Sequence, residues 1–354
     1  MSNVDLAQRS SIIFGCAGIT LDPEERELFR SVRPLGFILF GRNCQRPEQV
    51  RELICELREA CGDADTQILI DQEGGRVQRL GPPYWKRRPP AQTFGELARE
   101  NSTAGAEASR LVARLIASDL AALGITVDCA PVLDLPVPGS HGVIGDRAFA
   151  ADAKSTTDLG RAFCEGLLAG GVLPVIKHIP GHGRATVDSH HQLPRVEETE
   201  DALVAVDFAP FAALRDMPLA MTAHVLYSAL DSDNPVTLST TIIEEVIRGR
   251  IGFDGVLISD DISMNALPGS IVERVPRALG AGCDVVLHCN GEMEEMARIA
   301  EVVGTASDLT ARRWAEGVAM RRVPEPFDTD VAEHRLELLI GDVNRYGVVN
   351  ADGS

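Results

Sequence analysis

No apolar run in the sequence approaches the roughly 20 residues that a helix needs to cross a bilayer. Residues 1–11 contain no basic segment followed by an apolar one, and Ile12–Phe14 is far shorter than the core of a signal sequence. Low-complexity tracts are also absent. These absences predict a cytoplasmic protein.

Positive charge is scarce. The 52 acidic residues outnumber the 34 basic ones, so the net charge is −18 at pH 7. A charge of this sign repels phosphate backbones and anionic lipid headgroups, so we expect no nucleic acid and no membrane as partners. The eight cysteines lack the paired spacings of zinc sites or disulfide scaffolds, and we expect reduced core residues. They include Cys16, Cys55, Cys129, Cys164 and Cys283.

The sequence does contain a regular alternation of short β-branched runs and amphipathic segments, which is typical of parallel strands joined by helices. The expected strands are Ile12–Phe14, Gly36–Phe40, Gln67–Ile70, Thr126–Cys129, Leu173–Ile176, Leu219–Thr222, Gly255–Ile258 and Asp284–Leu287. The expected helices include Pro47–Ala60, Ala104–Leu123 and Thr240–Arg250. Eight strands predict an α/β fold, a closed (β/α)8 TIM-like barrel.

A barrel of this type takes about 250 residues and tolerates additions. We therefore expect one catalytic domain over residues 1–354, with a core of about residues 10–320 and a C-terminal extension of about residues 321–354. One helix, Val331–Leu339, is expected in that extension.

Polar residues follow nearly every expected strand. Barrel active sites are built at the C-terminal strand ends, whereas an open doubly wound sheet gathers such groups at one switch point. The residues are Arg42, Asn43, Asp71, Asp134, Lys177, His178, His224, Asp260, Asp261, His288 and Asn290.

The densest polar stretch runs from Lys177 to His191. Its glycines and proline predict a long, mobile loop after the fifth strand. Asp188 and His190 are two residues apart, so in a locally extended segment the carboxylate could orient the imidazole. Such a pair suits a general acid/base near neutral pH.

Two alternatives exist for this stretch. It could be a solvated surface loop, or His178, His182, Asp188 and His190 could bind a metal ion. Glycine and proline interruptions do not fix ligands as a helical His-x-x-x-His does, so we favour the acid/base and expect no metal or cofactor.

In the stretch Gly255–Met264, an apolar strand delivers Asp260 to the barrel mouth, where it can act as nucleophile or metal ligand. Ser and Asp also favour helix caps, so Asp261 is interpreted as a cap or a hydrogen-bonding partner.

In the stretch Asp71–Arg79, a glycine pair permits a turn that returns Arg76 or Arg79 to the mouth. Asp71 could accept hydrogen bonds from adjacent sugar hydroxyls, or it could stabilise the turn as an Asp–Arg ion pair. Arg147 is another loop arginine, weak evidence alone because a surface arginine is usually solvated.

Four motifs occur together and in order: Asp71-Gln-Glu-Gly-Gly-Arg-Val-Gln-Arg79, Lys177-His-Ile-Pro-Gly-His-Gly183, Asp188-Ser-His190 and Ser259-Asp-Asp-Ile-Ser-Met264. In these motifs, residues 10–300 resemble glycoside hydrolase family 3, in particular its short bacterial β-N-acetylhexosaminidases that trim peptidoglycan fragments in cell-wall recycling. The sequence departs from the family pattern at Ile179, often aromatic there, and at His191.

The resemblance implies a retaining enzyme with Asp260 as nucleophile, His190 as acid/base and Asp188 as its partner. It further implies that the non-reducing N-acetylglucosamine is bound by Asp71, Arg79, Arg147, Lys177 and His178, with His224 lining the same pocket. We expect a monomer acting on a small carbohydrate or muropeptide. The alternatives are a β-N-acetylglucosaminide phosphorylase, a metal-dependent barrel hydrolase and a non-catalytic sugar-binding protein.

Overall fold

The computed structural model describes residues 6–341 and contains a closed barrel of eight strands in the order β1-β12-β11-β9-β7-β6-β3-β2. Every neighbouring pair in the barrel is parallel. The strands are β1 (Ser10–Phe14), β2 (Pro34–Leu39), β3 (Gln67–Ile70), β6 (Val127–Asp128), β7 (Leu173–Ile179), β9 (Leu219–Thr222), β11 (Val256–Asp261) and β12 (Val285–His288). The predicted (β/α)8 barrel is confirmed.

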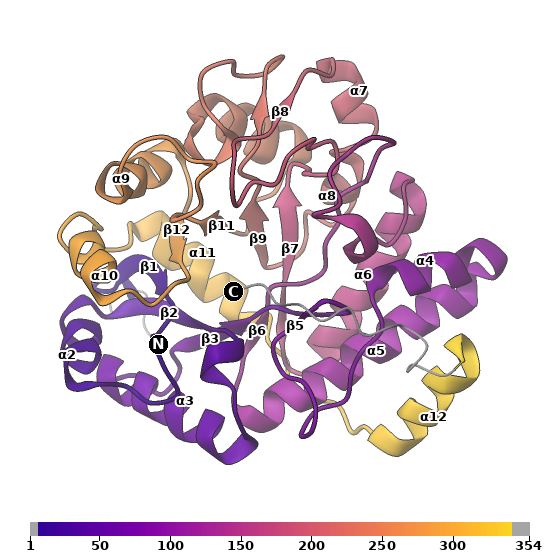
Figure 1. Cartoon of the computed structure of the whole chain (residues 1–354), viewed down its shortest axis with the longest axis horizontal. Helices are drawn as coiled ribbons and strands as arrows, with labels where there is room; N and C mark the ends of the chain where they lie inside the picture. The colour runs from indigo at the N-terminus through magenta and orange to yellow at the C-terminus, as the bar shows by residue number, and fades with distance from the viewer. Residues whose placement is uncertain (1–5, 342–354) are drawn as a thin grey trace.

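Helices surround the strands (Figure 1). They are α2 (Pro23–Val32), α3 (Pro47–Cys61), α4 (Ala91–Glu100), α5 (Ser102–Leu123), α6 (Ala153–Ala169), α7 (Glu200–Ala205), α8 (Ala209–Ala213), α9 (Ile271–Ala281), α10 (Met293–Ala300), α11 (Asp308–Ala319) and α12 (Thr329–Ile340). A π-helix, η4 (Ile242–Ile251), stands where the sequence predicts Thr240–Arg250. Within residues 6–341, no helix is both long and apolar enough to traverse a bilayer.

Local sequence signals explain where the helices begin and end. Helix α3 has Pro47 in its first turn, where no helical hydrogen bond needs the missing N–H. The helix is followed by Gly62, which caps its C-terminus in the left-handed conformation with φ +67°. Helix α2 is preceded by a capping box in which Asp22 accepts from the N–H of Glu25 and the Glu25 side chain accepts from Asp22.

The strands alternate between two apolar layers. On β3, Leu69 packs with Val127 and Val175 in a cluster formed by the barrel strands. Its neighbours Ile68 and Ile70 belong to the larger cluster that contains the surrounding helices. The period of two along a strand therefore fills the barrel interior with one set of side chains and its outer face with the other. Cys55 is exposed, so the prediction that it belongs to the core is wrong.

Three strands extend further toward the barrel mouth than predicted: β7 continues to Ile179, β11 to Asp261 and β12 to His288. The loop after β6 keeps pairing with β7: Lys177 N donates to Pro131 O at 3.1 Å, and Leu133 N donates to Lys177 O at 2.7 Å. The polar residues at these ends thus project from ordered strands.

The described part of the C-terminal extension contains α12, which packs beside α5 (Figure 1). Ala332 and Leu336 are its buried residues. Three ion pairs join it to the barrel helices and their loops: Arg335 pairs with Glu107, and Glu333 pairs with both Arg88 and Lys86. The remainder of the predicted extension, residues 342–354, lies outside the described residues.

Candidate active site

A cavity of about 460 Å³ opens at the C-terminal ends of the barrel strands. Of the nine residues singled out from the sequence, seven line it, and the other two, Asp188 and His224, contact residues that do. The seven are Asp71, Arg79, Arg147, Lys177, His178, His190 and Asp260.

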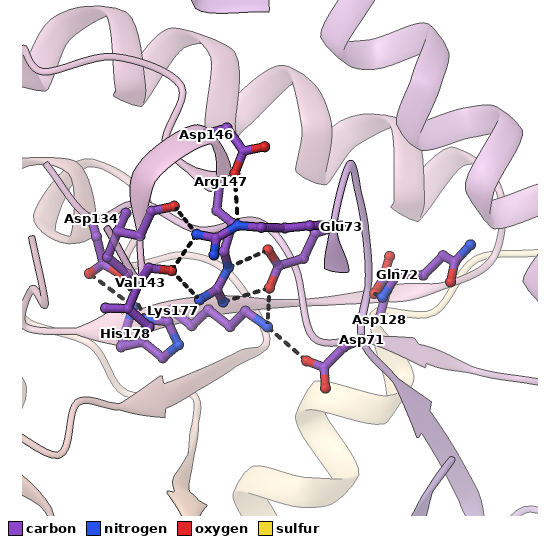
Figure 2. A network of polar contacts seen from close by, with 12 residues as sticks. Asp71, Gln72, Glu73, Asp128, Asp134, Val143, Asp146, Arg147, Lys177 and His178 are labelled. Atoms are coloured by element: carbon purple, nitrogen blue, oxygen red, sulfur yellow. Dashed lines mark hydrogen bonds and ion pairs between the residues drawn. The ribbon is translucent and has the colours of Figure 1, made fainter. Parts of the chain in front are cut away.

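A network of buried charges forms one wall of this cavity (Figure 2). Lys177 Nζ lies 2.8 Å from Asp71 Oδ1 and 2.7 Å from Glu73 Oε1. Arg147 contacts Glu73 in a bidentate geometry, with both N–O distances 2.8 Å. Arg79 Nη2 approaches Asp71 Oδ2 at 3.3 Å. The Asp–Arg ion pair considered for this turn therefore exists, and it belongs to the network.

The network fixes the charge of its members. Burial alone would raise the pKa of Asp71 and Glu73, but the adjacent cations outweigh it and hold the Asp71 pKa well below its usual range and that of Glu73 at about 2. Burial would lower the pKa of Lys177, yet Asp71 and Glu73 raise it above the ordinary value. All are ionised at neutral pH.

Asp260 lies near the end of β11 and faces the cavity. Burial works to raise its pKa, but His224, His178 and the N–H of Asp261 outweigh it and lower the pKa below the usual value. That N–H donates to Asp260 Oδ1 at 2.8 Å. Asp260 is therefore a carboxylate, the form that a nucleophile requires.

Asp261 has the hydrogen-bonding role that the sequence allowed. Its carboxylate accepts from Ser263 Oγ at 2.7 Å and from Cys289 N at 3.2 Å. These bonds fasten the turn after β11 to the end of β12.

Asp188 and His190 form a pair on the loop after β7, with Asp188 Oδ1 2.7 Å from His190 Nδ1. The segment is a turn and not an extended piece, the condition on which the expected orientation rested, because Asp188 O accepts from the N–H groups of His191 and Gln192. Orientation of the imidazole by the carboxylate is achieved all the same. The His190 side chain is 61% exposed, so it occupies the solvent side of the cavity.

His224 does not line the cavity, contrary to expectation. Its Nδ1 lies 2.7 Å from Thr237 Oγ1 and its Nε2 lies 2.9 Å from Asp261 O. With both nitrogens engaged and the ring fully buried, it can influence Asp260 electrostatically but has no nitrogen left for a sugar.

The four residues considered as metal ligands are not gathered into one cluster. His178 pairs with Asp134, and Asp188 pairs with His190. Within residues 6–341, no group of three or more His, Cys, Asp or Glu side chains has a geometry that could hold a metal ion.

Sequence reasoning gave no role to two central residues. Glu73 lies on β4 (Gln72–Gly74), two residues after Asp71. Residues two apart in an extended segment point to the same face, so this spacing could have revealed the role of Glu73. Asp134 was noted only as a strand-end residue, and its partners lie 44 and 48 positions further along the chain. No residue pattern around Asp134 in the sequence indicates these partners.

Residues 14–323 match the model of the glycosyl hydrolase family 3 N-terminal domain. The chain is 39% identical over 317 residues to a beta-hexosaminidase of Methylococcus capsulatus, a match that covers 88% of this chain and 92% of that protein. It is also 39% identical to a beta-hexosaminidase of Chromobacterium violaceum, covering 86% and 85%. The structure of NagZ from Neisseria gonorrhoeae superposes with a TM-score of 0.84 at 32% identity, covering 94% of this chain and 98% of that one.

Proposed function

The chain belongs to glycosyl hydrolase family 3, and from that membership we propose that it is a retaining β-N-acetylhexosaminidase that removes terminal, non-reducing β-linked N-acetylglucosamine. Its relatives are beta-hexosaminidases, and the Neisseria NagZ structure was solved with N-trifluoroacetyl-D-glucosamine. The observation that carries the proposal is one cavity lined by an ionised Asp260, a buried charge network and the Asp188-bound His190.

The charge network suits the non-reducing sugar. Sugar hydroxyls both donate and accept hydrogen bonds, and the network presents the carboxylate of Asp71 next to the donors of Lys177, Arg147 and Arg79. By the resemblance of its motifs, the substrate is proposed to be a 1,6-anhydro-muropeptide.

The proposed reaction is a double displacement. An oxygen of Asp260 attacks the anomeric carbon while His190, in its protonated form, donates a proton to the leaving oxygen, which gives a glycosyl-aspartate ester and the free aglycone. His190 then accepts a proton from water as the water oxygen attacks the same carbon and releases Asp260. The Asp188 carboxylate contacts Nδ1 of this imidazole at 2.7 Å and orients the ring.

Turnover of 4-nitrophenyl β-N-acetylglucosaminide tests this function. The D260A variant should lose activity on the order of 10⁴-fold, because it lacks the carboxylate that forms the ester. As a control, D216A removes an exposed carboxylate that pairs with Arg161 on α6, and it should keep wild-type activity. Full activity of D260A would contradict the proposal.

Two additions to the assay separate the alternatives. Turnover that rises with phosphate and yields a sugar 1-phosphate would identify a phosphorylase. Activity that is lost with EDTA and restored by a metal ion would identify a metal-dependent hydrolase. The proposed mechanism predicts neither effect.

A further inference from the structure

Asp134 is a fully buried carboxylate in the loop after β6, and two backbone N–H groups and one imidazole nitrogen converge on it. Its Oδ1 accepts from the backbone N–H of His178 at 3.2 Å and of His182 at 2.6 Å. Its Oδ2 lies 2.6 Å from Nδ1 of the His178 ring (Figure 2). One carboxylate thus contacts the end of β7 and the first turn of the loop that carries His190.

The chemistry of this contact determines where the His178 ring holds its proton. Burial would raise the pKa of Asp134, but the contacts with His178 and with the backbone N–H of His182 outweigh burial, and the pKa lies below the usual value. An ionised carboxylate only accepts hydrogen bonds, so Nδ1 must donate. In a neutral imidazole with a proton on Nδ1, Nε2 has a free lone pair.

That lone pair is available to a ligand. His178 lines the cavity, and Nε2 makes no hydrogen bond with any of residues 6–341. The carboxylates of Asp71 and Glu73 already form ion pairs with Lys177, Arg79 or Arg147. A cavity lined by four cationic side chains, Arg42, Arg79, Arg147 and Lys177, needs further acceptors for the hydroxyl hydrogens of a sugar.

We infer that Asp134 is a positioning residue that keeps a proton on Nδ1 of His178, so that Nε2 of the uncharged ring accepts a hydrogen bond from a sugar hydroxyl. The identity of that ligand rests on the proposed function, whereas the tautomer is a property of the free protein. Asp134 acts on the sugar only through His178.

Replacement of Asp134 by Asn reverses this polarity with little change of shape. The amide oxygen of the new side chain can accept the same two backbone hydrogen bonds. The flipped amide is disfavoured, because its NH2 group would then face two N–H donors. The NH2 then points at His178 Nδ1, which must become the acceptor. The proton moves to Nε2, and the ring presents a donor to a cavity that is already rich in donors.

The tautomer can be observed directly by NMR of ¹⁵N-histidine-labelled protein at pH 8.5, well above the ordinary histidine pKa of about 6.5. The chain has eight histidines, and H178Q identifies the resonances of His178. Two-bond ¹H–¹⁵N correlations should show a protonated Nδ1 in the wild type and a protonated Nε2 in D134N. Control variant D284N, which alters a buried Asp paired with Arg248 and Arg313, should leave the His178 signals unchanged.

Kinetics supply the second measurement. D134N should lower kcat/KM for the aryl glycoside about 10- to 100-fold, mainly through KM, because the lost hydrogen bond contributes to substrate binding before any bond is broken. A wild-type His178 with its proton on Nε2, or on both nitrogens, overturns the inference even if D134N fails to fold. So does a D134N spectrum identical to that of the wild type. An inactive wild type with the Nδ1–H tautomer would instead refute only the proposed function.

Discussion

Glu73 holds two of the cations that line the cavity, Lys177 and Arg147. Its Oε1 contacts Lys177 and Arg147, and its Oε2 contacts Arg147 again. The carboxylate is almost completely buried, so water cannot replace these contacts. Removal of its charge leaves an ammonium and a guanidinium close together with only Asp71 to balance them.

We therefore predict that E73Q weakens sugar binding. An amide has one acceptor oxygen where the carboxylate has two, so one cation meets an NH2 group instead of an oxygen. We expect kcat/KM to fall about 10- to 100-fold, which corresponds to roughly 1.4–3 kcal/mol. Steady-state kinetics on the aryl glycoside measure this loss.

E333Q is the matched control, because Glu333 also contacts one arginine and one lysine, Arg88 and Lys86, but lies on α12. It should keep wild-type kinetic constants. Equal losses of kcat/KM in both variants would mean that E73Q acts through general destabilisation, and the assigned role of Glu73 would be wrong.

Individual residues were predictable where the signal was local. Asp71 and Asp260 follow or end apolar strands, and that position alone brought them to the barrel mouth. The role of Asp134 was not predictable, because it depends on the path of a loop that meets His178 and His182 from another segment. The engagement of both His224 nitrogens depends in the same way on Thr237 and Asp261.

Among the elements, α12 is joined to the barrel by ion pairs of Glu333 and Arg335, and the partners of these two residues differ in burial. The Arg88 side chain is 5% exposed and contacts both Glu333 and Asp119. The Arg335 side chain is 49% exposed and contacts Glu107. Removal of one partner destabilises a protein far more when the remaining ion is buried than when it is exposed.

We predict that E333Q lowers the free energy of unfolding by about 1–3 kcal/mol, because the guanidinium of Arg88 stays buried with Asp119 as its remaining ionised partner. E107Q, which removes the exposed partner of Arg335, should cost about 0–1 kcal/mol. Urea denaturation measures both. A larger loss of unfolding free energy in E107Q than in E333Q would contradict the prediction that the buried ion pair of α12 stabilises the protein more than the exposed one.

The elements themselves followed from sequence more closely than their ends. The central residues of all eight strands were predicted, but β7 and β11 continue to Ile179 and Asp261. Apolar residues identify a strand in the sequence, whereas these extensions contain polar residues of the site. The sequence pattern therefore placed the strand ends too early. Likewise the Asp188–His190 segment is a turn, which a spacing of two residues cannot distinguish from an extended piece.

At the scale of the whole molecule, barrel closure brings the site together. Asp71, Lys177 and Asp260 come from β3, β7 and β11 or directly follow them, and they share one cavity because the parallel strands end at one face. Strand count and the spread of polar strand ends were enough to predict this convergence. The pairing of charges within it was not predictable, because side-chain contacts between strands are absent from any one segment.

Trapping the glycosyl-enzyme with a fluorinated N-acetylglucosamine donor, followed by peptide mass mapping, tests most directly whether Asp260 is the nucleophile. We predict one sugar per chain, attached to Asp260 within the peptide that contains Ser259–Met264, and no label in D260A. A label on another residue, or rapid turnover of the natural substrate by a protein that never becomes labelled at Asp260, would contradict a covalent mechanism through this residue.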